Sequence, residues 1–225
     1  MAPGIFVTAT DTDIGKTYVS RLLVEAIGET TSVTYMKPVQ TGCSRDKTGD
    51  PVAPDLEWVA RAREFRESAT DYHAPFCYER ACSPHLAARI EGRPISLQRI
   101  RECFGRLSAS ADCVVVEGAG GVLAPLSDSE SMLDLMRLLA LPVVLVTSPR
   151  LGTLNHTFLS IDAVLRAGLS LCGIVVNNAL NLPHDDVYVD NRVTIRSRFP
   201  QIPFVETGFR ASLTPAFKEF VHEIV

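Results

Sequence analysis

The chain has 225 residues, 46% of them hydrophobic and 21% charged, enough to bury the core of one α/β domain, or of two at most. Its formal net charge of −4 and pI of about 5.7 argue against a broad surface for nucleic acid or membranes. No signal peptide or long apolar span is visible, so we expect a cytoplasmic protein. The six cysteines form no Cys-x-x-Cys pair, and we interpret Cys103, Cys113 and Cys172 as reduced thiols in apolar segments.

Apolar runs with the character of buried strands recur along the chain. The expected strands span residues 5–9, 32–36, 113–116, 142–147, 171–176 and 202–205. Several are almost wholly apolar, such as Val143-Val144-Leu145-Val146, which is typical of parallel strands covered by helices on both faces.

Capping residues mark the starts of several expected helices, at Ser83-Pro84, Ser96, Ser131 and Thr214-Pro215. The expected helices span residues 18–27, 84–90, 96–107, 131–141 and 215–224. Residues 40–54 are irregular, and we interpret them as either a mobile active-site loop or a mere connection. This alternation predicts an α/β fold with a doubly wound, mostly parallel sheet and helices on both faces, formed as one domain over residues 1–225.

The most informative segment lies between the first expected strand and the first helix. It reads Thr10-Asp11-Thr12-Asp13-Ile14-Gly15-Lys16-Thr17. A strand, a tight loop ending in Gly-Lys-Thr and a helix form a phosphate-binding P-loop, whose backbone N–H groups favour an anion. Lys16 would then face the β and γ phosphates, and the Thr17 hydroxyl would face Mg²⁺. Thr10 stands where the common pattern has glycine, so a variant loop is predicted.

An acidic residue ends the strand over 113–116. Glu117 is followed by Gly118-Ala119-Gly120-Gly121, whose glycines let the backbone approach a ligand closely. In P-loop proteins an acid at the end of a neighbouring strand faces the Mg²⁺. Because the segment accompanies a P-loop, it favours a metal site over a plain strand end with a glycine-rich turn.

Four further polar positions have two interpretations when the residues are taken alone. Lys37 follows the second strand, and its spacing favours a solvated strand-end lysine over a phosphate-binding one. Asp55 fits best as a helix cap. The segment Gly152-Thr153-Leu154-Asn155 fits either an anion-binding helix N-terminus or a simple turn. Asn177-Asn178 fits either base-reading amides or an Asx turn.

Together these motifs resemble the dethiobiotin synthetase family of the biotin pathway, in the right order over nearly the whole chain. Besides the P-loop and the Glu117 segment, the resemblance rests on Lys37-Pro38-Val39-Gln40-Thr41-Gly42, Ser83-Pro84-His85, Glu91-Gly92-Arg93-Pro94-Ile95 and Leu151-Gly152-Thr153-Leu154-Asn155-His156. It implies a homodimeric enzyme that closes the ureido ring of dethiobiotin from diaminopelargonic acid, CO₂ and ATP, releasing ADP and phosphate. One substrate amine becomes a carbamate, the γ-phosphate is transferred to it, and the second amine expels phosphate.

The resemblance also implies roles for individual residues. The catalytic residues are Lys16 and Lys37, and the Mg²⁺ ligands are Thr17, Asp55 and Glu117. The nucleotide is held by Asp13, Ile14, Gly15, Lys16, Thr17, Tyr18, Glu117 and Asn177. The substrate is held by Thr12, Lys37, Thr41 and Gly118, together with Gly152, Thr153, Leu154 and Asn155 across a dimer interface. For Lys37 and Asp55 these roles replace the strand-end and cap interpretations.

The sequence departs from the family at two places that face the nucleotide. Asp13 stands where the family often has Glu. The family's base-contacting Gly-Glu-Ile-Pro stretch is replaced by residues 204–209, so the base preference of the enzyme is left open.

Two other kinds of P-loop protein are alternatives. A ParA/MinD-like switch ATPase usually has an extra lysine early in the loop, and Thr10-Asp11-Thr12 has none. A related amide-forming synthase usually carries an added glutaminase-type domain, for which 225 residues leave no room. We expect neither nucleic acid nor a membrane as a partner.

Overall fold

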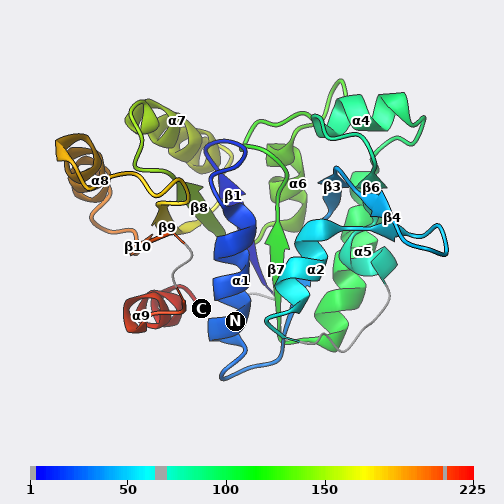
Figure 1. Ribbon diagram of the computed structural model, residues 1–225, viewed down its shortest axis with the longest axis horizontal. Helices are drawn as coiled ribbons and strands as arrows, with labels where there is room; N and C mark the ends of the chain where they lie inside the picture. Colours follow the sequence, from blue (N-terminus) through cyan, green and yellow to red (C-terminus); the bar gives the residue numbers. More distant parts are fainter. Residues whose placement is uncertain (1–3, 64–69, 210–211) are drawn as a thin grey trace.

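A parallel sheet of six strands forms the centre of the computed structural model, which describes residues 4–63, 70–209 and 212–225. The strand order is β10-β9-β8-β1-β7-β2, with neighbouring strands parallel throughout (Figure 1). The strands are β1 (Gly4–Ala9), β2 (Val33–Met36), β7 (Cys113–Glu117), β8 (Val143–Thr147), β9 (Leu171–Asn177) and β10 (Phe204–Thr207). The predicted doubly wound α/β fold is confirmed, and the strand order reverses direction at β1.

Helices cover both faces of this sheet. One face packs against α1 (Lys16–Ile27), α2 (Pro54–Ala60) and α9 (Pro215–Ile224). The other packs against α4 (Pro84–Ile90), α5 (Leu97–Ser110), α6 (Met132–Leu139), α7 (Thr153–Arg166) and α8 (Asp186–Arg198). The short helix α3 (Thr70–His73) lies beside α5. No helix among the described residues has the length and apolar character needed to cross a membrane.

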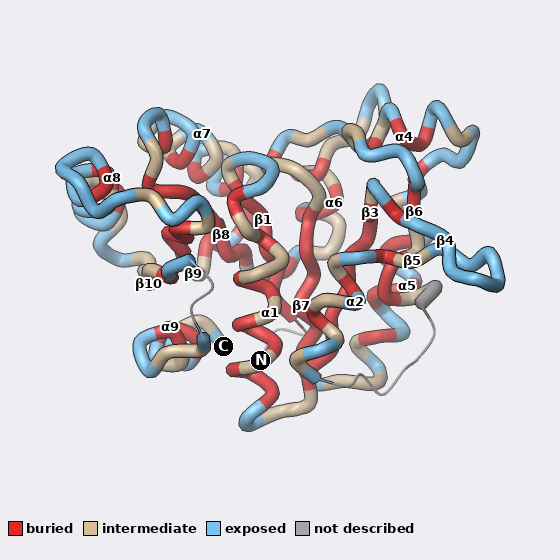
Figure 2. The backbone as a smooth tube through the Cα atoms, in the orientation of Figure 1, coloured by how far each residue is buried: buried red, intermediate tan, exposed pale blue. Residues whose placement is uncertain are grey.

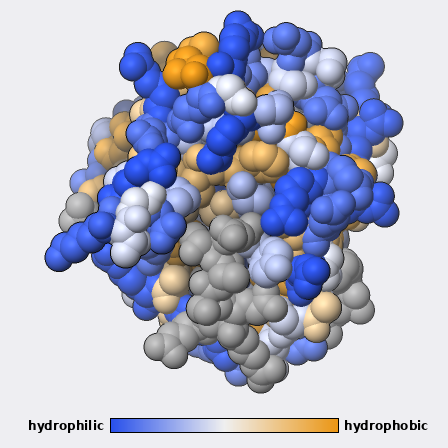
Figure 3. Space-filling model, turned by 90° about the vertical axis from the view of Figure 1, so that its right-hand side faces the viewer, coloured by the Kyte–Doolittle hydropathy of each residue, from blue (hydrophilic) through white to orange (hydrophobic). Residues whose placement is uncertain are grey.

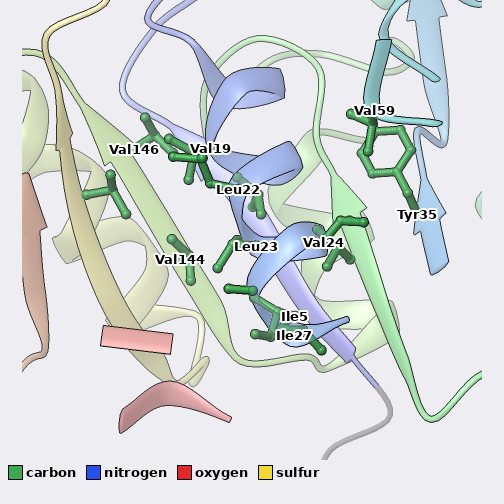
Figure 4. Packing of buried hydrophobic residues seen from close by; sticks show 14 of the residues in the cluster. Ile5, Val19, Leu22, Leu23, Val24, Ile27, Tyr35, Val59, Val144 and Val146 are labelled. Carbon is green, nitrogen blue, oxygen red and sulfur yellow. The ribbon is translucent and has the colours of Figure 1, made fainter. Parts of the chain in front are cut away.

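The two faces are separated by the alternation of side chains along the strands. In β1, Ile5 and Val7 join the cluster on the α1 face, whereas Phe6 between them joins the cluster on the other. Helix α1 meets β1 and β8 through apolar residues such as Val19 and Leu23 (Figure 4). Figure 2 shows the resulting pattern, with buried strands at the centre and exposure confined to outer helices and loops. The core therefore holds the carboxyl ends of the strands in fixed positions.

Residues 40–54 are more regular than the sequence indicated. Strand β3 (Val39–Thr41) pairs in parallel with β6 (Phe76–Tyr78), and β4 (Ser44–Arg45) forms an antiparallel hairpin with β5 (Pro51–Val52). The Asp46 carboxylate closes this hairpin by accepting hydrogen bonds from the backbone of Thr48 and Asp50, at 2.8 and 3.0 Å. Figure 3 shows the side of the molecule that carries the hairpin as mostly hydrophilic.

Most predicted element boundaries differ from the observed ones by a few residues. Strand β10 spans Phe204–Thr207 and not 202–205, and beyond its end the Thr207 carbonyl accepts the Asn178 N–H at 2.9 Å. Helix α1 starts at Lys16, α5 continues to Ser110, and α6 ends at Leu139.

The capping residues were largely as predicted. Ser96 and Thr214 accept backbone N–H groups of their helices, each at 3.2 Å. The Ser83 side chain makes no capping hydrogen bond, and Pro84 alone marks that start. None of the six cysteines, all of which lie within the described residues, is in a disulfide; Cys103 and Cys113 are buried, whereas Cys172 is only partly buried.

Candidate active site

A cavity of about 800 Å³ opens where β1, β2 and β7 end. This size suits a small-molecule ligand. The predicted site residues that line it are Thr12, Asp13, Gly15, Lys16, Thr17, Lys37, Thr41, Asp55 and Glu117. A hollow of similar volume lies beside β10 and α9, but it contains none of the predicted residues. The predicted site residues are therefore concentrated at the first cavity.

The P-loop at one wall of the cavity has a tightly constrained backbone. Gly15 has φ +83°, and Asp13 also lies in the left-handed region with φ +58°. Aspartate tolerates this conformation better than most residues, because its short polar side chain can bond locally. Asn177 braces the loop from β9, since its Nδ2 donates to the Ile14 carbonyl at 2.8 Å. The loop is thus shaped before any ligand binds.

Lys16 lies at the base of this loop and is almost fully buried. Its Nζ donates to the Asp11 carbonyl at 3.0 Å. Burial, and then the nearby Lys37 ammonium, lower the pKa of Lys16 to about 8. The cavity therefore holds two close lysines, an arrangement that favours a polyanionic ligand.

Glu117 is the centre of the polar network. It is fully buried at the end of β7, and its Oε1 accepts from Thr17 Oγ1 at 2.8 Å and from Lys37 Nζ at 2.5 Å. Its Oε2 accepts from the Tyr35 hydroxyl at 2.8 Å. Side chains from α1, from β2 and from the residue that follows β2 therefore contact the same Glu117 carboxylate.

Lys37 and Asp55 differ from the interpretation based on spacing alone. Lys37 is 4% exposed, so it is not a solvated lysine, and its Nζ lies 2.8 Å from Asp55 Oδ2. Burial by itself would lower the pKa of Lys37, but Glu117 and Asp55 outweigh it and raise the pKa above its usual value. Asp55 is not the helix cap, because Ala53 occupies that position and Asp55 lies in the first turn of α2.

The donor set around Glu117 fits a small hard cation. Thr17, Asp55 and Glu117 offer hydroxyl and carboxylate oxygens, and two of them already contact the Lys37 ammonium. The described residues contain no cluster of three or more His, Cys, Asp or Glu side chains suited to a metal. That is compatible with Mg²⁺, which is usually held by one or two carboxylates together with substrate phosphates and water.

The predicted segment from Gly152 to Asn155 lies elsewhere. Gly152, Thr153, Leu154 and Asn155 are not among the residues that line the cavity. Gly152 caps α7 with φ +90°, and the Thr153 hydroxyl is buried against Thr147 at 2.8 Å. Leu151 beside them is 85% exposed. The start of α7, with the free N–H groups of a helix N-terminus, therefore lies outside the lining of this cavity.

The remaining predicted residues lie at the borders of the site. Ile14 is buried beneath the loop, and Tyr18 packs at a tilt against Trp58, with ring centroids 6.1 Å apart. The Gly118 carbonyl accepts from Lys37 Nζ at 3.3 Å. Asn177 keeps its Oδ1 buried without a partner among the described residues, whereas Asn178 makes a local loop contact with Leu182.

Sequence reasoning missed three residues that shape the site. The Tyr35 hydroxyl donates a hydrogen bond to Glu117. A tyrosine in an apolar strand is a sequence signal for such a contact, because a buried hydroxyl usually has a hydrogen-bond partner. Arg150 bonds the P-loop residue Asp11, with Nη2 2.6 Å from Oδ2. Gln40 is buried in the cavity wall, and its Nε2 donates to the Thr41 carbonyl at 3.1 Å. Gln40 stands in a motif of the family resemblance, whereas only tertiary structure reveals the pairing of Arg150 with Asp11.

Comparison with known proteins identifies the relatives of this chain. A family model described as an AAA domain matches residues 3–206. The chain is 41% identical to the ATP-dependent dethiobiotin synthetase BioD of Anaeromyxobacter dehalogenans (strain 2CP-1), over 81% of this chain and 79% of that protein. It is 31% identical to the protein of the same name from Bacillus subtilis (strain 168), over 81% and 78%.

Solved structures with the same fold are more distant in sequence. A plasmid partition protein from Borrelia burgdorferi aligns with a TM-score of 0.59 at 11% identity, over 100% of this chain and 97% of that one. The cell division ATPase MinD of Pyrococcus furiosus aligns with a TM-score of 0.56 at 16% identity, over 100% and 98%. At such identities these likenesses establish the P-loop fold and leave the activity to the site and the sequence relatives.

Proposed function

This chain belongs to the family of ATP-dependent dethiobiotin synthetases, and we propose that it closes the ureido ring of dethiobiotin from diaminopelargonic acid, CO₂ and ATP. The observation that carries this proposal is the meeting of Lys16, Lys37, Thr17, Asp55 and Glu117 at one cavity. Phosphoryl transfer to a carbamate requires a phosphate cradle, a cation site and a charge beside the acceptor, and these residues would supply all three.

The P-loop is proposed to hold the triphosphate. Residues 13–18 would bind it, with the backbone N–H groups of the loop and of the α1 N-terminus directed at the phosphates. Lys16 adds a charge to the β and γ phosphates, and its Asp11 carbonyl partner orients the ammonium. Asn177 has a buried acceptor without a partner among the described residues, which suits an exocyclic amine of the base.

Mg²⁺ is proposed to lie among Thr17, Asp55 and Glu117, where it would neutralise charge on the transferring phosphoryl group. The oxygens of these three side chains support this, because a hard cation prefers hydroxyl and carboxylate ligands. Tyr35 would keep Glu117 in place from the side away from Thr17.

Lys37 is proposed to bind the carbamate and the phosphoryl group during transfer. Thr12, Thr41 and Gly118 would complete the substrate contacts, since Thr12 and Thr41 line the same cavity and Gly118 accepts from Lys37. Such fixed charges act mainly by positioning the reactants and by stabilising the negative charge of the transition state.

Gly152, Thr153, Leu154 and Asn155 are proposed to hold the substrate carboxylate in the site of a second copy of the chain. Their separation from their own cavity and the exposure of Leu151 support a homodimer. We also propose that the enzyme acts in the cytoplasm as one domain of residues 1–225, in keeping with the absence of disulfides among its described cysteines.

The switch-ATPase and amide-synthase alternatives are less well supported. The MinD and partition proteins share only the fold, at 11–16% identity, whereas the dethiobiotin synthetases are 31–42% identical over most of the chain.

The decisive assay is ATP-dependent formation of dethiobiotin from diaminopelargonate and bicarbonate. Lys37→Ala should lower turnover by about 100-fold or more, because it removes charge from the transition state. Lys47→Ala is the matched control, since Lys47 is exposed in the β4–β5 hairpin. Wild-type protein that makes no dethiobiotin under these conditions would refute the proposal.

A further inference from the structure

The ammonium of Lys37 uses all of its hydrogen-bond donors within the protein. It contacts Glu117 Oε1 at 2.5 Å, Asp55 Oδ2 at 2.8 Å and the Gly118 carbonyl at 3.3 Å. A lysine ammonium has three N–H donors and no acceptor. In this arrangement Lys37 has nothing left to donate to a carbamate or a phosphoryl group. A lysine that acts on the substrate must first leave at least one of these partners.

The partners that hold Lys37 are the same groups proposed to hold the metal. Glu117 Oε1 accepts both the ammonium and the Thr17 hydroxyl, and Asp55 reaches the ammonium from α2. The position between the two carboxylates is therefore suited to one cation at a time. A buried carboxylate without a neighbouring cation is strongly destabilising. The Lys37 ammonium compensates this negative charge, and a divalent cation would also compensate it.

We propose that Lys37 is the stand-in cation of the nucleotide-free site, and that a divalent cation displaces it toward the substrate. This inference rests on the proposed function and deepens it, because it makes the catalytic position of Lys37 depend on loading of the metal site. Lys37 stays paired with Asp55 and Glu117, and does not contact substrate, until Mg²⁺ and triphosphate bind. Its ammonium then turns into the cavity that Thr12 and Thr41 also line.

The competing arrangement is a permanent ion pair, in which Lys37 keeps Glu117 and Asp55 whether or not a metal is bound. The two arrangements differ in how the lysine affects the affinity for a bare cation. A stand-in cation competes with the metal, so its removal strengthens metal binding. A permanent pair affects the metal only through its charge, so its removal strengthens metal binding no more than removal of the nearby Lys16 charge does.

The test is Mn²⁺ binding to nucleotide-free protein, followed by the electron paramagnetic resonance signal of the free ion. Lys37→Met should lower the dissociation constant at least tenfold relative to wild type. Lys16→Met is the matched control, because Lys16 lines the same cavity but donates to a backbone carbonyl and to no carboxylate. It should give a clearly smaller change. Adding Glu117→Gln to Lys37→Met should abolish the gain.

A measurement on the wild-type protein tests the inference even if a variant fails to fold. The ¹⁵N resonance of the Lys37 ammonium can be assigned by its loss in Lys37→Gln, which keeps a donor for Glu117. It should shift on saturation with Mg²⁺ and a non-hydrolysable triphosphate. An unchanged resonance, unchanged or weaker Mn²⁺ binding in Lys37→Met, or an equal gain in Lys16→Met would each overturn the inference. None of these readouts needs turnover, so they stand apart from the dethiobiotin assay.

Discussion

Asn177 and Gly15 lie so close that no side chain can be added between them. A Cβ atom built on Gly15 would lie 2.1 Å from Asn177 Nδ2, the atom that donates to the Ile14 carbonyl. Gly15 also has φ +83°, a conformation that other residues rarely adopt. The P-loop therefore requires this glycine for two separate reasons, backbone conformation and contact with β9.

Gly15→Ala should lower both stability and triphosphate affinity, and Gly168→Ala separates the two causes. Gly168 has φ +75° but nothing within 4 Å of the added Cβ, so its loss is limited to the left-handed conformation, about 1–2 kcal/mol. Gly15→Ala should cost about 1–3 kcal/mol more, because it also displaces the buried Asn177 amide. Urea unfolding and calorimetric titration with ATP measure both effects. Equal losses in the two variants would show that the contact with Asn177 is unimportant.

The lowered pKa of Lys16 predicts pH-dependent triphosphate binding. Its pKa is about 8 in the nucleotide-free protein, and a bound triphosphate favours the charged form, so binding raises that pKa. Below pH 8 the lysine is already charged and binding takes up no proton at this group. Above it, binding must take up a proton, so affinity should fall as pH rises to about 9.5.

Calorimetry in two buffers of different ionisation enthalpy measures this proton uptake directly. Lys16→Arg is the control, because a guanidinium stays charged over the whole range and should bind with a flat profile there. A wild-type affinity that stays constant through pH 9.5 would contradict the prediction.

Arg150 should act on triphosphate binding through Asp11. The pair joins Nη2 and Oδ2 at 2.6 Å, with side chains 40% and 49% exposed, so it contributes at most about 1 kcal/mol to stability. The same Asp11 carries the carbonyl that orients Lys16. Arg150→Gln should therefore weaken ATP binding severalfold with little change in melting temperature. Arg166→Gln, which breaks an exposed pair with Asp162, is the matched control.

A double-mutant cycle distinguishes this indirect role from direct contact with the nucleotide. If Arg150 acts through Asp11, then Asp11→Asn should lower affinity by a similar factor, and the double variant should be no weaker than either single one. Additive losses would show that the two residues act independently.

Glu117→Gln should weaken the Mg²⁺ dependence of the enzyme. The amide keeps the size of the side chain but loses the charge that a hard cation favours, and it directs an NH₂ group at Thr17 or Tyr35. Activity at saturating Mg²⁺ should stay well below that of the wild type. Glu29→Gln, at a partly exposed ion pair with Lys218, serves as the control. An unchanged Mg²⁺ titration would exclude Glu117 from the metal site.

The sequence revealed the parts of this molecule that depend on local pattern. Continuous apolar runs predicted the strands of the central sheet, because strands buried on both faces have no need for alternation. The P-loop was recognisable because its glycine, lysine and threonine are contiguous. The hairpin of β4 and β5 was missed, since it is short, exposed and closed by one Asp46 side chain.

The spacing of residues in the sequence could not identify the partners of Lys37. Its place at a strand end was correctly predicted, but Asp55 and Glu117 are 18 and 80 positions away, and only the packing of α2 and β7 brings them to the same ammonium. For the same reason the local pattern suggested a solvated lysine, whereas the family resemblance placed both residues at the site. Arg150 and Asp11, separated by 139 positions, gave no signal at all.

The homodimer with shared sites leads to a complementation test. In each chain Lys37 lies in the cavity, whereas Asn155 is exposed in the first turn of α7 and does not line it. Asn155→Asp places a carboxylate where the proposed substrate carboxylate binds, so it should repel the substrate whether the native contact uses backbone or side chain. Gln98→Asp puts the same charge in the exposed first turn of α5, and it should leave activity unchanged.

Lys37→Ala and Asn155→Asp proteins should each be nearly inactive, and their mixture should recover activity after subunit exchange. In a mixed dimer one site receives Lys37 from one chain and Asn155 from the other, while the second site receives neither. Because random exchange makes half of the dimers mixed in a symmetric pair, recovery should reach roughly a quarter of wild-type activity. Exchange is verified independently with differently tagged chains. A mixture that exchanges but stays inactive would show that each site is built within one chain, and the start of α7 would then lose its proposed role.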